Sequence, residues 1–129
     1  MKFRSIGLLL ALVPLLVTLL AASEPKAGGW LERVPPSEHA QKSPIRSKAG
    51  AIAQGRNTFQ VHCAQCHGEN GRGSDRAPAL TTTRVQQHAT EGDLHWLLVN
   101  GDRERGMPAW AKLGDLQIWQ VITYLRSLP

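Results

Sequence analysis

The chain has 129 residues, and its 15 Lys and Arg residues outnumber its 10 Asp and Glu residues, for a formal net charge of +5. This length favours one small domain and excludes a large enzyme with two lobes around a substrate cleft. A content of 42% hydrophobic and 19% charged residues excludes a fully disordered polyelectrolyte. With only two cysteines, the chain is also not a scaffold built on several disulfides.

The N-terminus, residues 1–23, has the pattern of a secretory signal peptide. Lys2 and Arg4 precede an uncharged apolar run over residues 6–20, and small residues end the stretch. An uncleaved membrane anchor is the alternative, because residues 6–22 reach the lower limit of roughly 17 residues for a spanning helix. Both interpretations predict export, so we expect the rest of the chain in the periplasm, soluble or anchored to the inner membrane by its N-terminus.

Residues 24–49 are predicted to be a Pro-rich linker. They contain four prolines and a Gly-Gly pair, and they show neither a helical nor a strand period. The simplest interpretation is a tether that carries a few isolated hydrophobic residues. The alternative is that Trp30 docks on the domain that follows.

The charge of the predicted folded part, residues 50–129, is nearly balanced. Eight basic and seven acidic residues leave it a net charge of +1, so most of the excess charge belongs to the leader and the linker. This part has no basic stripe of the kind that nucleic-acid binding requires. We therefore expect no nucleic-acid partner, and membrane contact only through residues 1–23 if they are not cleaved.

Residues 50–129 are predicted to form an all-α domain with three main helices joined by loops, because no alternating strand pattern occurs. In the first helix, spacings of three and four separate the residues of one face, Ile52, Gly55, Phe59 and Cys63. A long loop with several glycines and prolines follows it.

The second and third helices are predicted from capping residues and apolar stripes. Thr90 and Asp93 have the spacing of a capping box, and Asn100-Gly101 is expected to end the second helix. Its apolar face consists of Leu94, Leu97 and Leu98. Asp115 is expected to cap the third helix, whose stripe consists of Ile118, Val121, Ile122 and Leu125.

The strongest motif is Cys63-Ala64-Gln65-Cys66-His67, which contains both cysteines of the chain. The C-x-x-C-H pattern is the attachment site of a c-type haem. Two thiols one helical turn apart can each form a thioether with one haem vinyl group, and His67 is then held against the iron as its proximal ligand. We therefore predict one covalently bound haem c.

Two other interpretations of this motif fit less well. A redox disulfide would be expected after a strand in a βαβ unit, and no such unit is predicted. A structural zinc site needs a second pair of ligands with finger-like spacing, and the chain has no further cysteine.

Met107 is the candidate for the second, distal iron ligand. Apart from Met1 it is the only methionine, and it lies 40 residues beyond His67 in Gly106-Met107-Pro108. Stiff backbone between glycine and proline suits the presentation of a side chain to a fixed point, whereas filling a helix core is the alternative role. A thioether ligand favours ferrous iron and raises the reduction potential.

Three histidines are rival ligands. His62 adjoins the attachment motif on its helix, so we do not expect it to reach the opposite face of the haem. His88 lies in a polar run and is expected in solvent, and His95 is expected at the surface or in a packing role.

Several stretches of the chain match one family. In chain order they are Gly55–Phe59, Cys63–Gly71, Pro78–Leu80, Asn100-Gly101, Gly106–Trp110 and Gln120–Leu128. With these motifs, residues 54–129 resemble the small monohaem class I cytochrome c domain of bacterial exported electron carriers. The resemblance covers about three fifths of the chain and leaves the leader and the linker outside.

The resemblance implies a cytochrome c-like fold wrapped around the haem. In this fold the first and last helices cross where Gly55 and Phe59 meet Tyr124. Residues near the haem propionates vary within the family, so a role there for Trp110, Arg103 and Arg105 is left open.

The resemblance also implies the details of the haem site. The Pro78 carbonyl would accept a hydrogen bond from Nδ1 of His67, which fixes the imidazole and strengthens it as a ligand. Met107 would be the distal ligand.

Two functions compete at such a site. If His67 and Met107 close the iron, only an electron moves, and the protein is a periplasmic carrier or the cytochrome subunit of a respiratory or dehydrogenase complex rather than an enzyme itself. Its partners would then be a redox donor and acceptor, such as a dehydrogenase or a terminal oxidase. If the distal site is open, the protein is a haem-based gas sensor or a peroxidase-like protein. Met107 and the 62 residues that follow His67 favour electron transfer.

Overall fold

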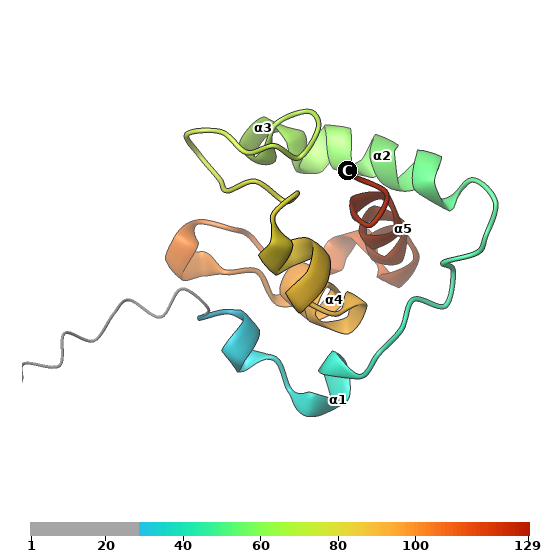
Figure 1. Cartoon of the computed structure of the whole chain (residues 1–129), viewed down its shortest axis with the longest axis horizontal. Coiled ribbons are helices and arrows are strands. Elements are labelled where there is room, and N and C mark those ends of the chain that lie inside the picture. Colours follow the sequence, from blue (N-terminus) through green and yellow to red (C-terminus); the bar gives the residue numbers. More distant parts are fainter. Residues whose placement is uncertain (1–28) are drawn as a thin grey trace, which may run out of the picture.

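The computed structural model describes residues 29–129, and helices joined by loops make up this part of the chain (Figure 1). Within it there is no strand, only one isolated bridge between Asp102 and Met107. The predicted all-α class is therefore confirmed. The predicted leader, residues 1–23, lies outside the described residues.

The crossing of α2 (Ala51–His62) and α5 (Asp115–Leu125) forms the centre of the fold. A Cβ atom on Gly55 would lie 1.9 Å from the carbonyl oxygen of Gln120, so only glycine allows the two backbones to approach this closely. Next to this point the rings of Phe59 and Tyr124 lie 5.3 Å apart between centroids. These contacts are the ones that the family resemblance implies.

The core surrounds this crossing. Phe59 is fully buried, and the whole predicted stripe of α5 is buried as well, with exposed fractions of 5% or less at Ile118, Val121, Ile122 and Leu125. Burial of such side chains is worth roughly 1.5–3 kcal/mol each, so this interface stabilises the fold.

Helix α4 (Glu91–Asn100) begins and ends as predicted. The Thr90 side chain accepts a hydrogen bond from the backbone N–H of Asp93, and the Asp93 carboxylate accepts one from the N–H of Thr90 at 2.7 Å. The helix ends at Gly101, whose φ of 73° lies in the left-handed region that favours glycine. On its apolar face Leu94 and Leu98 are buried.

Two predicted details are wrong. Ile52 is 50% exposed, and Ala51 takes its place on the buried face, because positions 51, 55 and 59 are four residues apart and share one helix face. Asp115 is the first residue of α5 rather than its cap, and Gly114 occupies the cap position without a side-chain hydrogen bond. The Asp115 carboxylate instead accepts a hydrogen bond from Nε2 of His95 at 3.0 Å.

The shorter elements lie in the loops between the main helices. They are α3 (Ala64–His67), a π-helical turn η2 (Arg84–His88), and the 3-10 turns η3 (Arg103–Arg105) and η4 (Ala111–Leu113). The turn η2 lies in the stretch that the sequence presents as an open loop. None of the helices in residues 29–129 has both the length and the apolar character needed to cross a membrane.

Residues 29–49, here called the N-terminal segment, lie against α4. They contain a 3-10 turn η1 (Leu31–Arg33) and the short helix α1 (Pro36–His39). A Cβ atom on Gly92 would lie 1.8 Å from the carbonyl oxygen of Glu38, so α1 touches the backbone of α4 directly. Trp30 and Leu31 are half-buried against the core.

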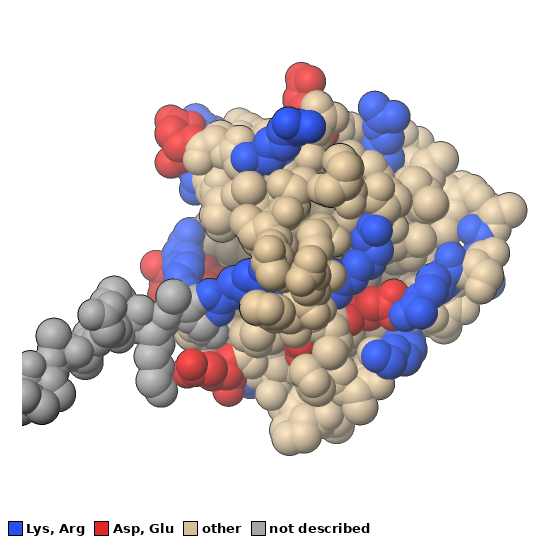
Figure 2. Space-filling model, in the orientation of Figure 1, with Lys and Arg blue, Asp and Glu red and all other residues tan. Residues whose placement is uncertain are grey.

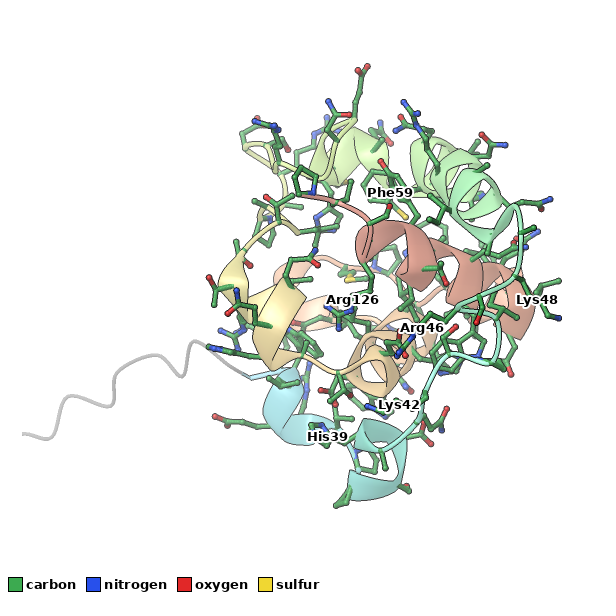
Figure 3. The ribbon with its side chains drawn as sticks, turned by 45° about the vertical axis from the view of Figure 1, so that its right-hand side comes forward. His39, Lys42, Arg46, Lys48, Phe59 and Arg126 are labelled. Carbon is green, nitrogen blue, oxygen red and sulfur yellow. The ribbon has the colours of Figure 1, made fainter. Side chains whose placement is uncertain are left out.

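Polar contacts hold the N-terminal segment to the start of α4. The His39 ring donates from Nδ1 to the buried Asp93 carboxylate at 2.8 Å, and Arg46 donates from Nε to Glu91 at 3.0 Å. Figure 3 shows His39 beside α1, and Arg46 higher in the view, close to Arg126 of the chain end. An extended tether would not make these contacts with α4.

Candidate functional site

The attachment motif lies on one helical turn that continues from the end of α2. Cys63 is the residue between α2 and α3, and its carbonyl accepts hydrogen bonds from the N–H groups of Cys66 and His67 at 3.1 and 2.9 Å. Neither cysteine forms a disulfide; Cys63 is half-buried and Cys66 is exposed. The two thiols are therefore presented one turn apart, as thioether formation with two vinyl groups requires.

The Cys63 thiol has a shifted pKa. Burial, with a smaller contribution from the neighbouring Cys66, raises the pKa of this thiol to about 11. No group of three or more His, Cys, Asp or Glu side chains in residues 29–129 is placed to hold a metal ion.

The His67 ring is oriented by the loop that follows α3. Its Nδ1 donates a hydrogen bond to the Pro78 carbonyl oxygen at 2.9 Å. This contact is the one that the family resemblance implies, and it leaves Nε2 as the ring nitrogen available to a metal.

A folded-back loop brings Pro78 to His67. The N–H of Gly73 donates to the His67 carbonyl at 2.8 Å, and the Ser74 hydroxyl donates to the Cys66 carbonyl at 2.6 Å. A Cβ atom on Gly73 would lie 2.6 Å from the N atom of Ala79, so this position accepts only glycine. The glycines of the predicted loop thus serve to return the chain to the attachment motif.

Met107 lies in a second closed loop, residues 101–110, here called the Met107 loop. Asp102 and Met107 exchange two backbone hydrogen bonds, each of 2.9 Å, and the N–H of Trp110 donates to the Leu98 carbonyl at 2.7 Å. A Cβ atom on Gly101 would lie 2.7 Å from the N atom of Ala109, so the backbone at the start of the loop touches the backbone near its end. Met107 itself is half-buried against the core.

The Met107 loop and α3 with its following loop lie on the same side of the molecule in Figure 1, above and beside the start of the described chain. A pair of free thiols, a histidine with a free Nε2 and a half-buried thioether are together the donor set of a covalently bound haem with its iron. The residues present therefore fit the group that the motif predicts.

The rival histidines have other contacts. The ring of His95 stacks on Trp119 with centroids 4.3 Å apart and is buried, which is the packing role among the expected alternatives. His88 is exposed, as predicted. The His62 ring lies 5.2 Å from that of Trp110, between centroids.

The structure also gives a role to residues that the sequence analysis left open or missed. Arg105, left open as a neighbour of the propionates, donates to the Asp102 carboxylate at 2.8 Å. Arg33 of the N-terminal segment donates to the other oxygen of the same carboxylate at 2.8 Å. Asp102 was not singled out because an acidic residue after a helix end is ordinarily solvated.

Burial by itself would raise the pKa of the Asp102 carboxyl. The hydrogen bonds and positive charges of Arg105 and Arg33 outweigh this effect, and the pKa lies below its ordinary value. Asp102 is therefore a buried, ionised group with two cationic partners.

Comparisons with known proteins identify the family of this chain. The family model described as cytochrome c oxidase, cbb3-type, subunit III matches residues 50–125. The cbb3-type cytochrome c oxidase subunit CcoP of Azospirillum brasilense is 34% identical over 87 residues, which are 62% of this chain and 29% of that protein. The CcoP subunit of Azospirillum sp. (strain B510) is 34% identical over 91 residues, covering 60% of this chain and 31% of that protein. The chain thus spans about three tenths of the length of these relatives.

A solved structure supports the fold. The crystal structure of cytochrome cL from the marine methylotrophic bacterium Methylophaga aminisulfidivorans MPT is similar, with a TM-score of 0.55 and 23% identity over 65% of this chain and 57% of that chain. The described helices therefore have the cytochrome c fold.

The family model covers more than half of the chain, and its region contains the attachment motif, the Pro78 contact and the Met107 loop. A cytochrome c domain transfers electrons and implies a covalently bound haem c with its iron. The chain belongs to the cbb3-type cytochrome c oxidase subunit III family and carries a small class I c-type cytochrome domain.

Proposed function

We propose that this protein transfers single electrons through one haem c that is attached at Cys63 and Cys66 and bound axially by His67 and Met107. Bound there, the haem supplies one-electron exchange between ferrous and ferric iron. The single attachment motif in these 129 residues supports one haem in this domain.

The observation that carries this proposal is the hydrogen bond from His67 Nδ1 to the Pro78 carbonyl, because it directs Nε2 of the same ring to the metal. Met107 supports it as well, since its backbone is held in a closed loop by the two hydrogen bonds with Asp102. His67 and Met107, both held by stiff backbone, would hold the iron with little change of their own positions when it exchanges an electron.

The test is an absorption spectrum of the haem-loaded protein, oxidised and reduced, with and without carbon monoxide. We expect a low-spin iron that ignores carbon monoxide, and we expect Met107→Ala to make it high-spin and reactive. His88→Ala, which changes an exposed histidine, is the control and should leave the spectrum unchanged. Carbon monoxide binding to the unaltered protein would instead indicate an open distal site, and with it gas sensing or peroxidase-like chemistry.

We further propose that the protein is exported, that residues 1–23 direct export, and that it acts with a terminal oxidase of the cbb3 type as a subunit or as an electron donor. The similarity to the CcoP subunits supports this partner. The division into a leader over residues 1–23, a linker over 24–49 and a cytochrome c domain over 50–129 remains part of the proposal, with the N-terminal segment in contact with the domain.

Stopped-flow mixing tests the partner. Reduced protein is mixed with a purified cbb3-type oxidase in the presence of oxygen, and we expect its reoxidation to accelerate with oxidase concentration. A rate equal to that without oxidase would remove this oxidase as the electron acceptor. N-terminal sequencing of the protein from the periplasm and from the membrane would show whether the leader is cleaved.

A further inference from the structure

A long-range ion pair connects the N-terminal segment to the Met107 loop. Arg33 donates from one guanidinium nitrogen to Oδ1 of Asp102 at 2.8 Å, across 69 residues of sequence. Its second terminal nitrogen lies 3.7 Å from the exposed Glu104 carboxylate. Figure 2 shows basic and acidic side chains next to one another on the left of the molecule, where the described chain begins.

Asp102 is the point at which this ion pair reaches the methionine. The Asp102 side chain is only 4% exposed, and two of the three backbone hydrogen bonds of this residue are made with Met107, the third being accepted from the N–H of Arg105. A shift of the Asp102 backbone therefore shifts Met107. Leaving a buried carboxylate without its cationic partners costs folding free energy. Asp102 is therefore held where Arg33 and Arg105 can reach it.

The two arginines belong to different parts of the molecule. Arg105 belongs to the Met107 loop itself, three residues beyond Asp102, so it moves with the loop. Arg33 belongs to η1, where its N–H donates to the Trp30 carbonyl at 3.1 Å and where Trp30 and Leu31 pack against the core. Of these two arginines, only Arg33 makes an ion pair that joins the loop to a different part of the chain.

We propose that Arg33 is a positioning residue for Met107: through the Asp102 carboxylate it restricts opening of the Met107 loop and so keeps the thioether on the iron. This inference rests on the proposed function, in which Met107 is the distal ligand. Arg33 lies outside residues 50–125, the part of the chain that the family model matches. The N-terminal segment thus contributes to the stability of the distal bond.

The test measures cyanide binding to the oxidised, haem-loaded full chain, because cyanide can reach the iron only after Met107 has left it. We expect Arg33→Ala to accelerate cyanide binding about three- to tenfold, in line with the loss of one partly exposed charged hydrogen bond. The charge-transfer band of the ferric iron–thioether bond should weaken in the same variant. Arg33→Lys keeps the charge but not the fork geometry, and it should give an intermediate rate.

Arg46→Ala is the matched control. Arg46 also ties the N-terminal segment to α4 through a carboxylate, that of Glu91, but it does not contact the Met107 loop. Cyanide binding to this variant should match that of the unaltered protein. Equal acceleration in both arginine variants would mean general loosening of the segment and would overturn the proposal, as would an unchanged rate in Arg33→Ala.

Hydrogen exchange of the Met107 amide gives a second readout that does not depend on ligand binding. This N–H donates to the Asp102 carbonyl, so its exchange should accelerate in Arg33→Ala and not in Arg46→Ala. The failure of the proposed function is recognised separately. If Met107→Ala leaves the spectrum of the iron unchanged, Met107 is not the ligand, and the positioning role falls with it.

Discussion

Two helix contacts in this molecule each depend on a glycine, and they differ in the chemistry around it. At the α2–α5 crossing, a Cβ atom on Gly55 would lie 1.9 Å from the Gln120 carbonyl oxygen. At the contact of α1 with α4, a Cβ atom on Gly92 would lie 1.8 Å from the Glu38 carbonyl oxygen. In both places backbone meets backbone, and any larger residue must separate them.

The surroundings of the two glycines are unlike. Gly55 is followed on its helix face by the fully buried Phe59 (Figure 3). The Phe59 ring packs on that of Tyr124. Gly92 lies between Glu91 and Asp93, whose buried carboxylates accept hydrogen bonds from side chains of the N-terminal segment. The first contact is therefore held by burial of apolar surface and the second mainly by charged hydrogen bonds.

The difference shows how one small domain combines two kinds of interface. Apolar burial supplies large, non-directional stability, which suits the core that supports the haem ligands. Charged hydrogen bonds supply less net free energy but fix geometry, which suits a segment that positions a loop.

Gly55→Ala should have the largest effect. A methyl group cannot fit at 1.9 Å from a backbone oxygen, so α2 and α5 must move apart, and we expect a loss of about 3 kcal/mol or more in the free energy of unfolding. Urea unfolding of the haem-loaded protein measures this loss. Asn57→Ala, at an exposed position of the same helix, should cost less than about 0.5 kcal/mol. A small effect of Gly55→Ala would mean that the crossing is not tightly packed.

Gly92→Ala should have a smaller and more local effect. The alanine itself favours α4 by about 1 kcal/mol, whereas its methyl group displaces α1, so we expect a net loss of about 1–3 kcal/mol. Limited trypsin digestion checks where the loss occurs, because cleavage after Lys42, Arg46 and Lys48 should accelerate before the rest of the domain is cut. Unchanged cleavage at these sites would show that the contact of α1 with α4 does not hold the segment.

Glu91→Gln should change the acid stability of the protein. Burial raises the pKa of the Glu91 carboxyl, and the hydrogen bonds from Arg46 and Ser43 outweigh this, so the pKa lies below its ordinary value. The stabilisation by ionised Glu91 is therefore complete above the pKa of an unfolded-chain glutamate and is lost as the pH falls through the lowered folded-state pKa.

We therefore expect the unaltered protein to be more stable than Glu91→Gln at neutral pH, and this difference to narrow as the pH falls below about 4.3. Thermal unfolding at a series of pH values measures it. Glu69→Gln, at an exposed position, is the control and should parallel the unaltered protein at every pH. A gap that stays constant down to acid pH would show that the charge of Glu91 does not contribute.

Val61→Ala should have the smallest effect. Val61 is 74% exposed on α2, so little apolar contact is lost, and alanine is the better helix former by about 0.5 kcal/mol. We expect the free energy of unfolding to change by less than about 0.5 kcal/mol in either direction. A loss above 1 kcal/mol would indicate that this face of α2 has a partner in solution.

Much of the fold could be predicted because its signals are local. The capping box of Thr90 and Asp93 needs only a spacing of three residues, and the stripe of α5 needs only a helical period. The candidate site was predicted for similar reasons, since the attachment motif is one helical turn and Met107 is the only methionine in the folded part of the chain. The misassignment of Ile52 arose at a helix end, where one residue of offset rotates the face by 100°.

The sequence by itself determined which residues form helices and which side chains have the chemistry of a haem site, because periodicity, capping and the C-x-x-C-H spacing act within a few residues of chain. Only the tertiary structure decided that the Pro-containing N-terminal segment reaches back to α4 and that Arg33 meets Asp102. An ion pair between residues 69 positions apart leaves no periodic pattern, since either residue alone is ordinary on a solvated surface. It becomes specific only when folding buries the carboxylate and brings the guanidinium to it.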